Sequence, residues 1–485
     1  MSTSVAAHTT EPAPPRAKRS TSRGWTLGIV SLGLFMVVLD NLVVTVALPS
    51  IHRQLGASIQ SLEWTVNAYV LSYAVLLLTG AALGDRFGRR RMFVTGLALF
   101  TVSSAAAALA PSMGLLIAAR AVQGLGGAIV TPLTLTLLAD AFPPERRGLA
   151  LGVWSGISGI AVALGPLVGG AKIQAASWHW IFWINVPIGA ILAPVAARRL
   201  SESHGPSRAL DLRGLGLAST GLFGLVFGLV RAQTLGWTAL EVLVALAGGV
   251  ALIATFVVTE LRSDDPMLPM EFFRKRSFAV TNAVSLSMYF GMFGSIFFMS
   301  QYLQSVLGNS ALQAGVKMLV WTGSTMVVAP IAGVMSDRLG SRPFLVAGLA
   351  LQSIALVWLA SLASVHQTYL SMVIPFMFGG SGMALVFAPA ANAVLSSVRT
   401  DQAGQASGAT NAIRELGGVL GVAVLSTVFT AHGSYASGQD FVNGLVPAMW
   451  VGAVVLASGS LLALALPFST RTREATVVTT APAAA

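Results

Sequence analysis

The segment Gly84–Arg91 places five charges in eight residues between two long apolar runs. Neither run, 71–83 before it or 92–109 after it, contains a charged residue. Uncharged runs of this kind are typical of membrane spans, and a basic cluster at the end of a span is typical of its cytoplasmic side. We therefore expect a short cytoplasmic turn between two membrane-spanning helices, in which the two glycines let the chain reverse direction.

The composition favours a membrane protein over a soluble one. The 485 residues are 55% hydrophobic and only 10% charged, whereas soluble domains average about 25% charged residues. The net charge of +11 does not indicate a nucleic-acid partner, because the positive charges fall in short loops between apolar runs. The chain has no cysteine, which excludes disulfides, thiolate chemistry and cysteine-based metal sites.

Apolar runs of about 20 residues predict an all-α membrane protein with fourteen transmembrane helices. The predicted spans are 25–48, 65–84, 92–110, 114–139, 149–171, 180–197, 214–232, 239–260, 278–303, 314–336, 344–363, 369–395, 405–430 and 441–467. Residues 1–24 and 469–485 are expected to be cytoplasmic tails, and the first of them is expected to be disordered. The first apolar run is too long for the core of a signal peptide, so we expect it to remain as a span.

The distribution of the 29 Lys and Arg residues predicts the orientation. If both termini are cytoplasmic, most of these residues fall in cytoplasmic segments, as the positive-inside rule requires. The exceptions are Arg53, Lys172, Arg231 and Lys317 in external segments, and Arg120 and Arg414 within spans. We therefore expect a multi-pass protein of the inner (cytoplasmic) membrane with both termini inside.

A faint internal repeat divides the chain. Gly84–Arg90 follows the second predicted span, and Ser336–Arg342 follows the tenth with the same spacing of aspartate, arginine and glycine. The repeat predicts two six-helix bundles, 25–200 and 266–468, with two extra helices inserted at 201–265. Two similar bundles around a site at their interface are typical of alternating-access transporters.

Several motifs along the chain resemble those of one family. They are the turn 84–91, the first-helix residues around Asp40, the segment Leu116–Ala128 that contains Arg120 and Gln123, the span-5 motif Gly165–Gly170, and Trp180–Gly189 together with Arg414–Gly418. The sequence resembles the fourteen-span drug:proton antiporters of the major facilitator superfamily over about 25–467. The resemblance implies multidrug efflux driven by the proton gradient, without a cofactor.

Four ionisable residues lie well inside predicted spans, where a charge costs roughly 3 kcal/mol on insertion scales. Asp40 is a candidate for proton or substrate coupling; the alternative is a buried acid bonded to a neighbouring helix. Arg120 stays charged, so it cannot carry the proton, but with Gln123 it can tune a nearby acid or serve only as a structural partner.

Arg414 and Glu415 are adjacent in the sequence and therefore point about 100° apart on a helix. We expect Glu415 to face the cavity as a second titrating or cation-binding group. Arg414 would then face the cytoplasmic gate or another helix. The alternative is an acid that is only neutralised by its neighbouring arginine.

The charged turns are expected to form a cytoplasmic gate. By resemblance, Asp85 meets the positive end of the helix that begins near Gln405, and Asp140 is a partner for Arg89 or Arg86. The alternative is a basic loop that only sets the topology. The predicted gating residues are Gly84, Asp85, Arg86, Gly88, Arg89, Arg90, Asp140, Asp337 and Arg338.

Small residues and aromatic residues complete the predicted site. Gly156, Gly165, Pro166, Gly169 and Gly170 would give span 5 a smooth, bendable face for close packing between the bundles, or plain close packing alone. Met and aromatic side chains suit varied apolar or cationic ligands, although the same residue types also face lipid. The candidate pocket residues are Tyr289, Met292, Phe293, Phe376 and Phe387.

The sequence thus predicts a monomeric antiporter that exchanges protons for a small amphipathic substrate, and two acids within the spans favour a cationic one. The alternatives are a dedicated exporter of one natural product, as in antibiotic self-resistance, or a non-transporting membrane sensor. An enzyme is not expected, because the six histidines are scattered near tails and span ends, and no metal cluster or phosphate-binding loop is recognisable.

Overall fold

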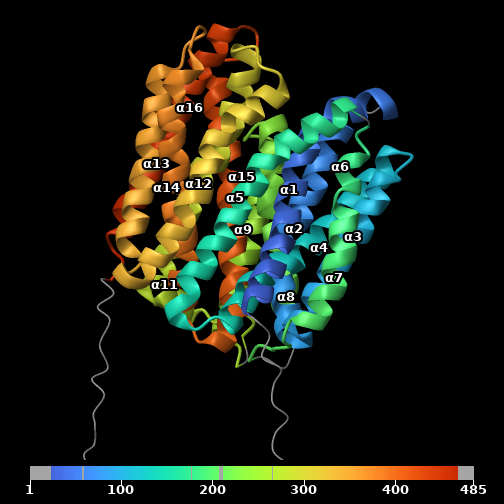
Figure 1. Cartoon of the computed structure of the whole chain (residues 1–485), viewed down its shortest axis with the longest axis vertical. Coiled ribbons are helices and arrows are strands. Elements are labelled where there is room, and N and C mark those ends of the chain that lie inside the picture. The colour runs from blue at the N-terminus through green and yellow to red at the C-terminus, as the bar shows by residue number, and fades with distance from the viewer. Residues whose placement is uncertain (1–22, 57–58, 176, 207–210, 265, 468–485) are drawn as a thin grey trace, which may run out of the picture.

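The computed structural model describes residues 23–56, 59–175, 177–206, 211–264 and 266–467, and these ranges contain long helices and no strand. Figure 1 shows the helices running side by side along the long axis of the molecule. The helices are α1 (Arg23–Leu55), α2 (Ile59–Phe87), α3 (Arg89–Ala108), α4 (Met113–Ala141), α5 (Pro144–Ala175), α6 (Trp180–Trp183), α7 (Asn185–Arg199), α8 (Leu212–Leu235), α9 (Leu240–Arg262), α10 (Glu271–Arg274), α11 (Arg276–Gln301), α12 (Ala311–Leu339), α13 (Arg342–Leu362), α14 (Tyr369–Ser396), α15 (Ala403–His432) and α16 (Gly438–Ala463).

Within the described residues, thirteen helices are long and apolar enough to cross a membrane. The short α6 and α7 together make one of these spans, Trp180–Arg199. Helix α5 is 32 residues long and covers the fifth predicted span. The side chains of Pro166, Gly169 and Gly170 lie outside the described residues, so the predicted bend and seam at this motif stay predictions.

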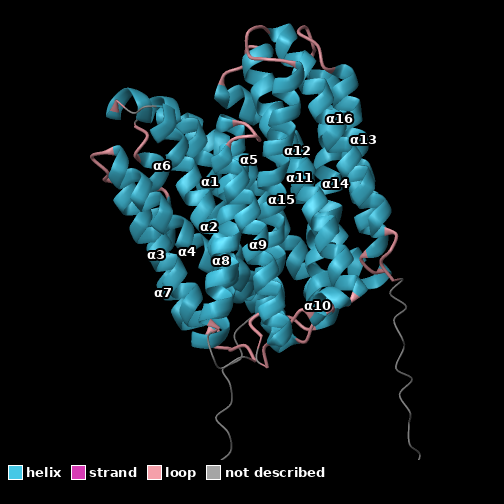
Figure 2. Ribbon diagram, turned by 180° about the vertical axis from the view of Figure 1, so that it is seen from behind, coloured by secondary structure: helices cyan, strands magenta, loops and turns pink. Residues whose placement is uncertain are grey.

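The long helices pack as two groups. The first group is α1–α7, in which α4 packs against α2 and α3, and α1 packs against α5. The second group is α11–α16, in which α14 packs against α12 and α13, and α11 packs against α15 and α16. The two groups meet along two seams, α5 with α12 and α2 with α15. Figure 2 shows the ribbons of the groups close together at the lower end and farther apart at the upper end.

Glycines allow the backbones to touch along the α5–α12 seam. An added Cβ at Gly148 would overlap the carbonyl oxygen of Gly333, and one at Gly333 would overlap the carbonyl oxygen of Gly148. One and two turns farther along α5, Gly152 packs on Pro330 and Gly156 packs on Met326. Small residues at such positions let helices approach at backbone distance. This close contact joins the two groups near the end that carries the charged turns.

Helices α8 and α9 pack on each other and sit beside the α2–α15 seam. Gly224 and Gly249 face one another in this pair, again at backbone distance. Much of α9 is exposed and apolar, as expected of a helix that faces lipid. Its exposed large side chains are Leu240, Leu243, Val244, Val250, Val258 and Leu261.

Candidate transport site

A cavity of ≈ 110 Å³ lies between the two helix groups. The first group contributes residues of α1, α2, α4 and α5, and the second contributes residues of α11, α14 and α15. Among the residues that line the cavity, Glu415 is the one that carries a formal charge. The lining consists of Leu34, Val37, Val38, Asn41, Tyr69, Tyr73, Thr131, Trp154, Ser158, Tyr289, Met292, Phe293, Ile296, Met383, Phe387, Asn411 and Glu415.

Aromatic rings form much of the cavity wall. Tyr289 contacts Phe293 and Phe387 at centroid distances of 5.5 and 5.6 Å, and Tyr69 stacks on Tyr73 at 5.8 Å on the opposite side. Four of the five predicted pocket residues, Tyr289, Met292, Phe293 and Phe387, therefore line the cavity.

The fifth predicted pocket residue, Phe376, lies elsewhere. It is fully buried, and its ring packs against Trp321 at 5.9 Å and Tyr369 at 6.4 Å. Phe376 and Phe387 are eleven residues apart on α14, which is about three turns, so they share a similar direction but lie at different depths. The helical spacing of residues in the sequence could not show that Phe376 and Phe387 lie at different depths along α14.

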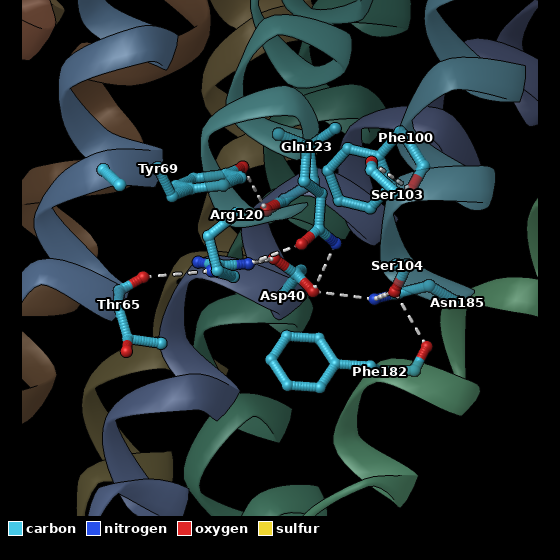
Figure 3. Close-up of polar contacts among 12 residues, drawn as sticks. Asp40, Thr65, Tyr69, Phe100, Ser103, Ser104, Arg120, Gln123, Phe182 and Asn185 are labelled. Carbon is cyan, nitrogen blue, oxygen red and sulfur yellow. Dashed lines mark hydrogen bonds and ion pairs between the residues drawn. The ribbon is translucent and has the colours of Figure 1, made fainter. Parts of the chain in front are cut away.

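Asp40 lies in the interior of the first group, where it is 1% exposed. Its carboxylate accepts hydrogen bonds from Arg120 Nη1 at 2.5 Å, Gln123 Nε2 at 2.9 Å and Asn185 Nδ2 at 2.7 Å. Figure 3 shows these donors converging on the carboxylate from α4 and α7. Three donors, one of them cationic, therefore enclose this carboxylate.

The guanidinium of Arg120 is held through its Nε and Nη1 atoms. It is 0% exposed, donates from Nε to the carbonyl oxygen of Thr65 at 3.3 Å and from Nη1 to Gln123 Oε1 at 2.8 Å, and lies 4.2 Å from the ring centroid of Tyr69. The sequence placed Asp40, Arg120 and Gln123 in one candidate site, and the structure brings them into one network. Asp40 itself is not among the cavity-lining residues; the ring of Tyr69 contacts both Arg120 and the cavity.

Arg414 and Glu415 take different positions on α15. Glu415 lines the cavity. Arg414 is 1% exposed and lies among aromatic rings, 5.8 Å from the centroid of Tyr289 on α11 and 5.6 Å from that of Phe387 on α14. Of the two positions expected for Arg414, the structure therefore shows the one against neighbouring helices.

Arg89 organises the turn after α2. Its guanidinium donates to Asp85 Oδ1 at 2.9 Å, to both carboxylate oxygens of Asp140 at 3.0 Å, and to the carbonyl oxygen of Asp401 at 2.8 Å. Asp85 also lies against Gly404, where an added Cβ would overlap its carboxylate. The start of α15, with its positive helix end, therefore rests on the carboxylate of Asp85, one residue before the position expected from the sequence.

The other residues of this turn have different surroundings. Gly88 has φ = 105°, a backbone conformation that favours glycine. Gly84 packs on the side chain of Leu133, so α2 and α4 lie close together there. Arg90 pairs with Glu202 at 3.4 Å, whereas Arg86 is exposed.

The turn after α12 repeats this arrangement toward the first group. Asp337 Oδ1 accepts hydrogen bonds from the backbone N–H of Gly148, in the first turns of α5, and from Asn392 Nδ2, both at 3.1 Å. Gly340 follows with φ = 77°, and Arg338 is exposed. Asp85 and Asp337 thus each precede a positive-φ glycine by three residues, and each contacts the beginning of a helix in the other group.

Several contributors to the site were not identified from the sequence, and three of them are polar residues on different helices. Asn185 is 0% exposed and bonds both Asp40 and Ser104 Oγ; its position as a lone amide in an apolar run was the available signal. Tyr69 and Asn411 line the cavity, but nothing in their sequence context separates them from residues that face other helices.

Comparison with known proteins identifies the family. The profile of the Major Facilitator Superfamily matches residues 30–422. The chain belongs to the major facilitator superfamily. Members of this superfamily are membrane transporters rather than enzymes, and the chain is accordingly a multi-pass membrane protein.

The chain is similar in sequence to other members of the superfamily and similar in fold to a solved structure. The chain is 35% identical to the tetracenomycin C resistance and export protein of Streptomyces glaucescens, over 84% of this chain and 77% of that protein. It is also 35% identical to the multidrug resistance protein Stp of Mycobacterium tuberculosis, over 84% of this chain and 76% of that protein. The human organic anion transporter MFSD10 (TETRAN) shares the fold, with a TM-score of 0.68 at 16% identity over 91% of this chain and 99% of that one.

Proposed function

We propose that this protein exports amphipathic compounds across the cytoplasmic membrane in exchange for protons, by alternating access. The observation that carries the proposal is the cavity between the two helix groups, with Glu415 as the carboxylate in its lining. A cavity at the interface of two helix groups can open to either side as the groups rock. The proton gradient supplies the energy, so the mechanism needs no cofactor, and one copy of the chain contains the whole pathway.

The proposed architecture has fourteen transmembrane helices. Helix α5 is long enough to be the fourteenth, at 32 residues and about 1.5 Å rise per residue. Six-helix bundles at 25–200 and 266–468, with α8 and α9 inserted between them, account for the two packing groups and for the matching turns at Asp85 and Asp337. Both termini then lie in the cytoplasm at the end that carries these turns.

The contacts at this end act as a cytoplasmic gate in the proposed mechanism. Asp85 on the start of α15 and Asp337 on the start of α5 each favour approach of the two bundles through the helix dipole. Arg89 adds a bond to the Asp401 carbonyl across the same seam. The described conformation is then closed toward the cytoplasm, and transport requires these contacts to break once in each cycle.

We assign proton exchange to Glu415 and a structural role to Asp40. An exchanging acid must be reachable from the substrate cavity, and Glu415 lines it. Asp40 is enclosed by Arg120, Gln123 and Asn185, and protonating it would leave the buried Arg120 without its counter-charge, which costs several kcal/mol.

The proposal has two forms, a multidrug exporter and a dedicated exporter of one compound, which differ in the breadth of the substrate range. One relative is named for export of a single compound, tetracenomycin C, and another for multidrug resistance. Both forms use the same cavity and the same proton site. Transport assays over a panel of compounds distinguish a dedicated exporter from a multidrug exporter, whereas a sensor would transport none of them.

The proposal is tested by proton flux in proteoliposomes with an acidic interior. Two dyes are added outside in parallel: rhodamine 6G, an ethyl ester, and rhodamine 19, its free acid. We expect at least one dye to collapse the pH gradient with the wild-type protein. Asp40→Asn, reconstituted at an equal amount, should retain at least a tenth of the wild-type rate of collapse. Glu415→Gln should show no dye-dependent collapse. Collapse that survives Glu415→Gln but not Asp40→Asn would move the proton site to Asp40. Absence of collapse with both dyes would reject the proposed function.

A further inference from the structure

Arg414 is a buried cation without a hydrogen-bond partner among the described residues. Its side chain is 1% exposed, and none of its three nitrogen atoms, Nε, Nη1 and Nη2, has an acceptor among the described residues. The rings of Tyr289 and Phe387 lie against the guanidinium. Ring faces attract a guanidinium, but they accept none of its five N–H groups in the way that oxygen atoms do.

Such an arrangement is costly for a structural residue. A charge removed from water without a partner loses far more than the ring contacts return. Another buried arginine of the same chain has several acceptors: Arg120 donates from Nε and Nη1 to Asp40, Gln123 and the carbonyl of Thr65, and its Nη2 alone has no acceptor among the described residues. The contrast indicates that an acceptor for Arg414 arrives from outside the described residues.

The position of Arg414 directs that acceptor to the substrate cavity. Tyr289 and Phe387, the rings beside the guanidinium, both line the cavity. The next residue, Glu415, lines it as well. A ligand in the cavity is therefore separated from the guanidinium by one layer of side chains, and a movement of either ring admits it.

The chemistry of the acceptor follows from the guanidinium. Its planar fork of N–H groups matches two oxygens of a carboxylate, and it is preorganised for this bidentate contact. The surrounding rings of Tyr289, Phe293 and Phe387 suit an aromatic or polycyclic body. A purely cationic substrate would leave Arg414 unpaired and would be repelled by it.

We propose that Arg414 binds a carboxylate of the substrate, while the aromatic wall holds its apolar body. This inference rests on the proposed function and specifies its substrate class as aromatic acids and zwitterions. It replaces the expectation of a cationic substrate, because the two acids behind that expectation have different surroundings: Asp40 is neutralised by Arg120, and Glu415 lies beside a cation.

The test compares binding of two probes that differ at one group. Rhodamine 19 carries a free carboxylate, and rhodamine 6G carries the ethyl ester of the same acid. Fluorescence anisotropy with the full chain in lipid nanodiscs should show wild type binding the acid about tenfold more tightly than the ester, or more, as expected for a charge-assisted bidentate contact. Arg414→Gln should abolish this preference by weakening the acid and not the ester, and Arg414→Lys should restore part of it.

A matched control removes a different arginine. Arg231 pairs with Glu241 at the far end of α8, so Arg231→Gln should keep the full preference for the acid. A wild type that binds the ester as tightly as the acid overturns the inference, whether or not Arg414→Gln folds. An Arg414→Gln protein that retains the preference for the acid also overturns the inference. So does an Arg414→Gln protein that binds both probes equally weakly with an unchanged thermal midpoint, because Arg414 would then only shape the cavity or pair with Glu415.

Flux measurements separate this inference from the proposed function. Proton flux driven by rhodamine 6G in Arg414→Gln proteoliposomes, together with no preference for the acid in the wild type, would reject the role of Arg414 and keep the antiporter. Absence of flux with both dyes in the wild type would reject both.

Discussion

Arg120 in the first helix group and Arg414 in the second are both buried, and the two residues differ in almost everything except burial. Arg120 on α4 is 0% exposed and Arg414 on α15 is 1% exposed. Arg120 has an acid, an amide and a carbonyl as partners, whereas Arg414 has two rings. Burial of a charge therefore does not define its role. A charge with partners fixes the packing around it, and a charge without partners is available to a ligand.

The largest loss of stability should come from replacing Arg120, the arginine with hydrogen-bond partners. In Arg120→Gln the carboxylate of Asp40 stays buried without its counter-charge, which should lower the free energy of unfolding by about 3–5 kcal/mol. Thermal unfolding in detergent, monitored by intrinsic fluorescence, measures the loss. The double variant Asp40→Asn with Arg120→Gln should recover most of it, because no uncompensated charge remains. A single variant as stable as the wild type would show that the network does not hold the first group together.

The sequence predicted the members of the Arg120 network because charges within apolar runs are conspicuous. Asp40, Arg120 and Gln123 were all recognisable in this way, and the structure places them together. Asn185 was missed because a single amide in a span has many explanations that involve no functional site. The helical runs followed from hydropathy, and the repeated motif predicted the two charged turns that contain Gly88 and Gly340, although Gly84 lies within α2 and not in the turn.

The partners of Arg414 could not be predicted in the same way. Helix geometry correctly separated the directions of Arg414 and Glu415, but the rings beside Arg414 come from α11 and α14, which are distant in sequence. The depth of a residue in the membrane is also weakly encoded, and the pocket prediction therefore included Phe376, which packs on Trp321 instead. Contacts between spans depend on tilt and rotation, which an apolar pattern leaves open.

An intermediate effect should come from the amide that completes the Asp40 network. Asn185→Ala removes a 2.7 Å bond to the carboxylate and a 3.1 Å bond to Ser104, and we expect a loss of about 1.5–3 kcal/mol, as for hydrogen bonds to a charged group. The same unfolding measurement applies. The control is Asn443→Ala on the exposed face of α16, which should change stability by less than about 0.5 kcal/mol. Equal losses in the two variants would show that Asn185 contributes only general packing.

The smallest loss of stability should come from Arg414→Gln, although Arg414 is as buried as Arg120. The substitution removes a buried charge that has no hydrogen bond to lose among the described residues, so the relief of desolvation should at least offset the lost ring contacts, each of which is worth about 0.5–2 kcal/mol. We expect the free energy of unfolding to fall by no more than about 1 kcal/mol, well below the loss in Arg120→Gln. Measured side by side in the same detergent without substrate, losses of equal size would mean that Arg414 has a structural partner, and the contrast between the two arginines would then fail. If Arg414 binds the ligand, Arg414→Gln should lose no stability without substrate. It should also gain less stability than the wild type does when rhodamine 19 is added.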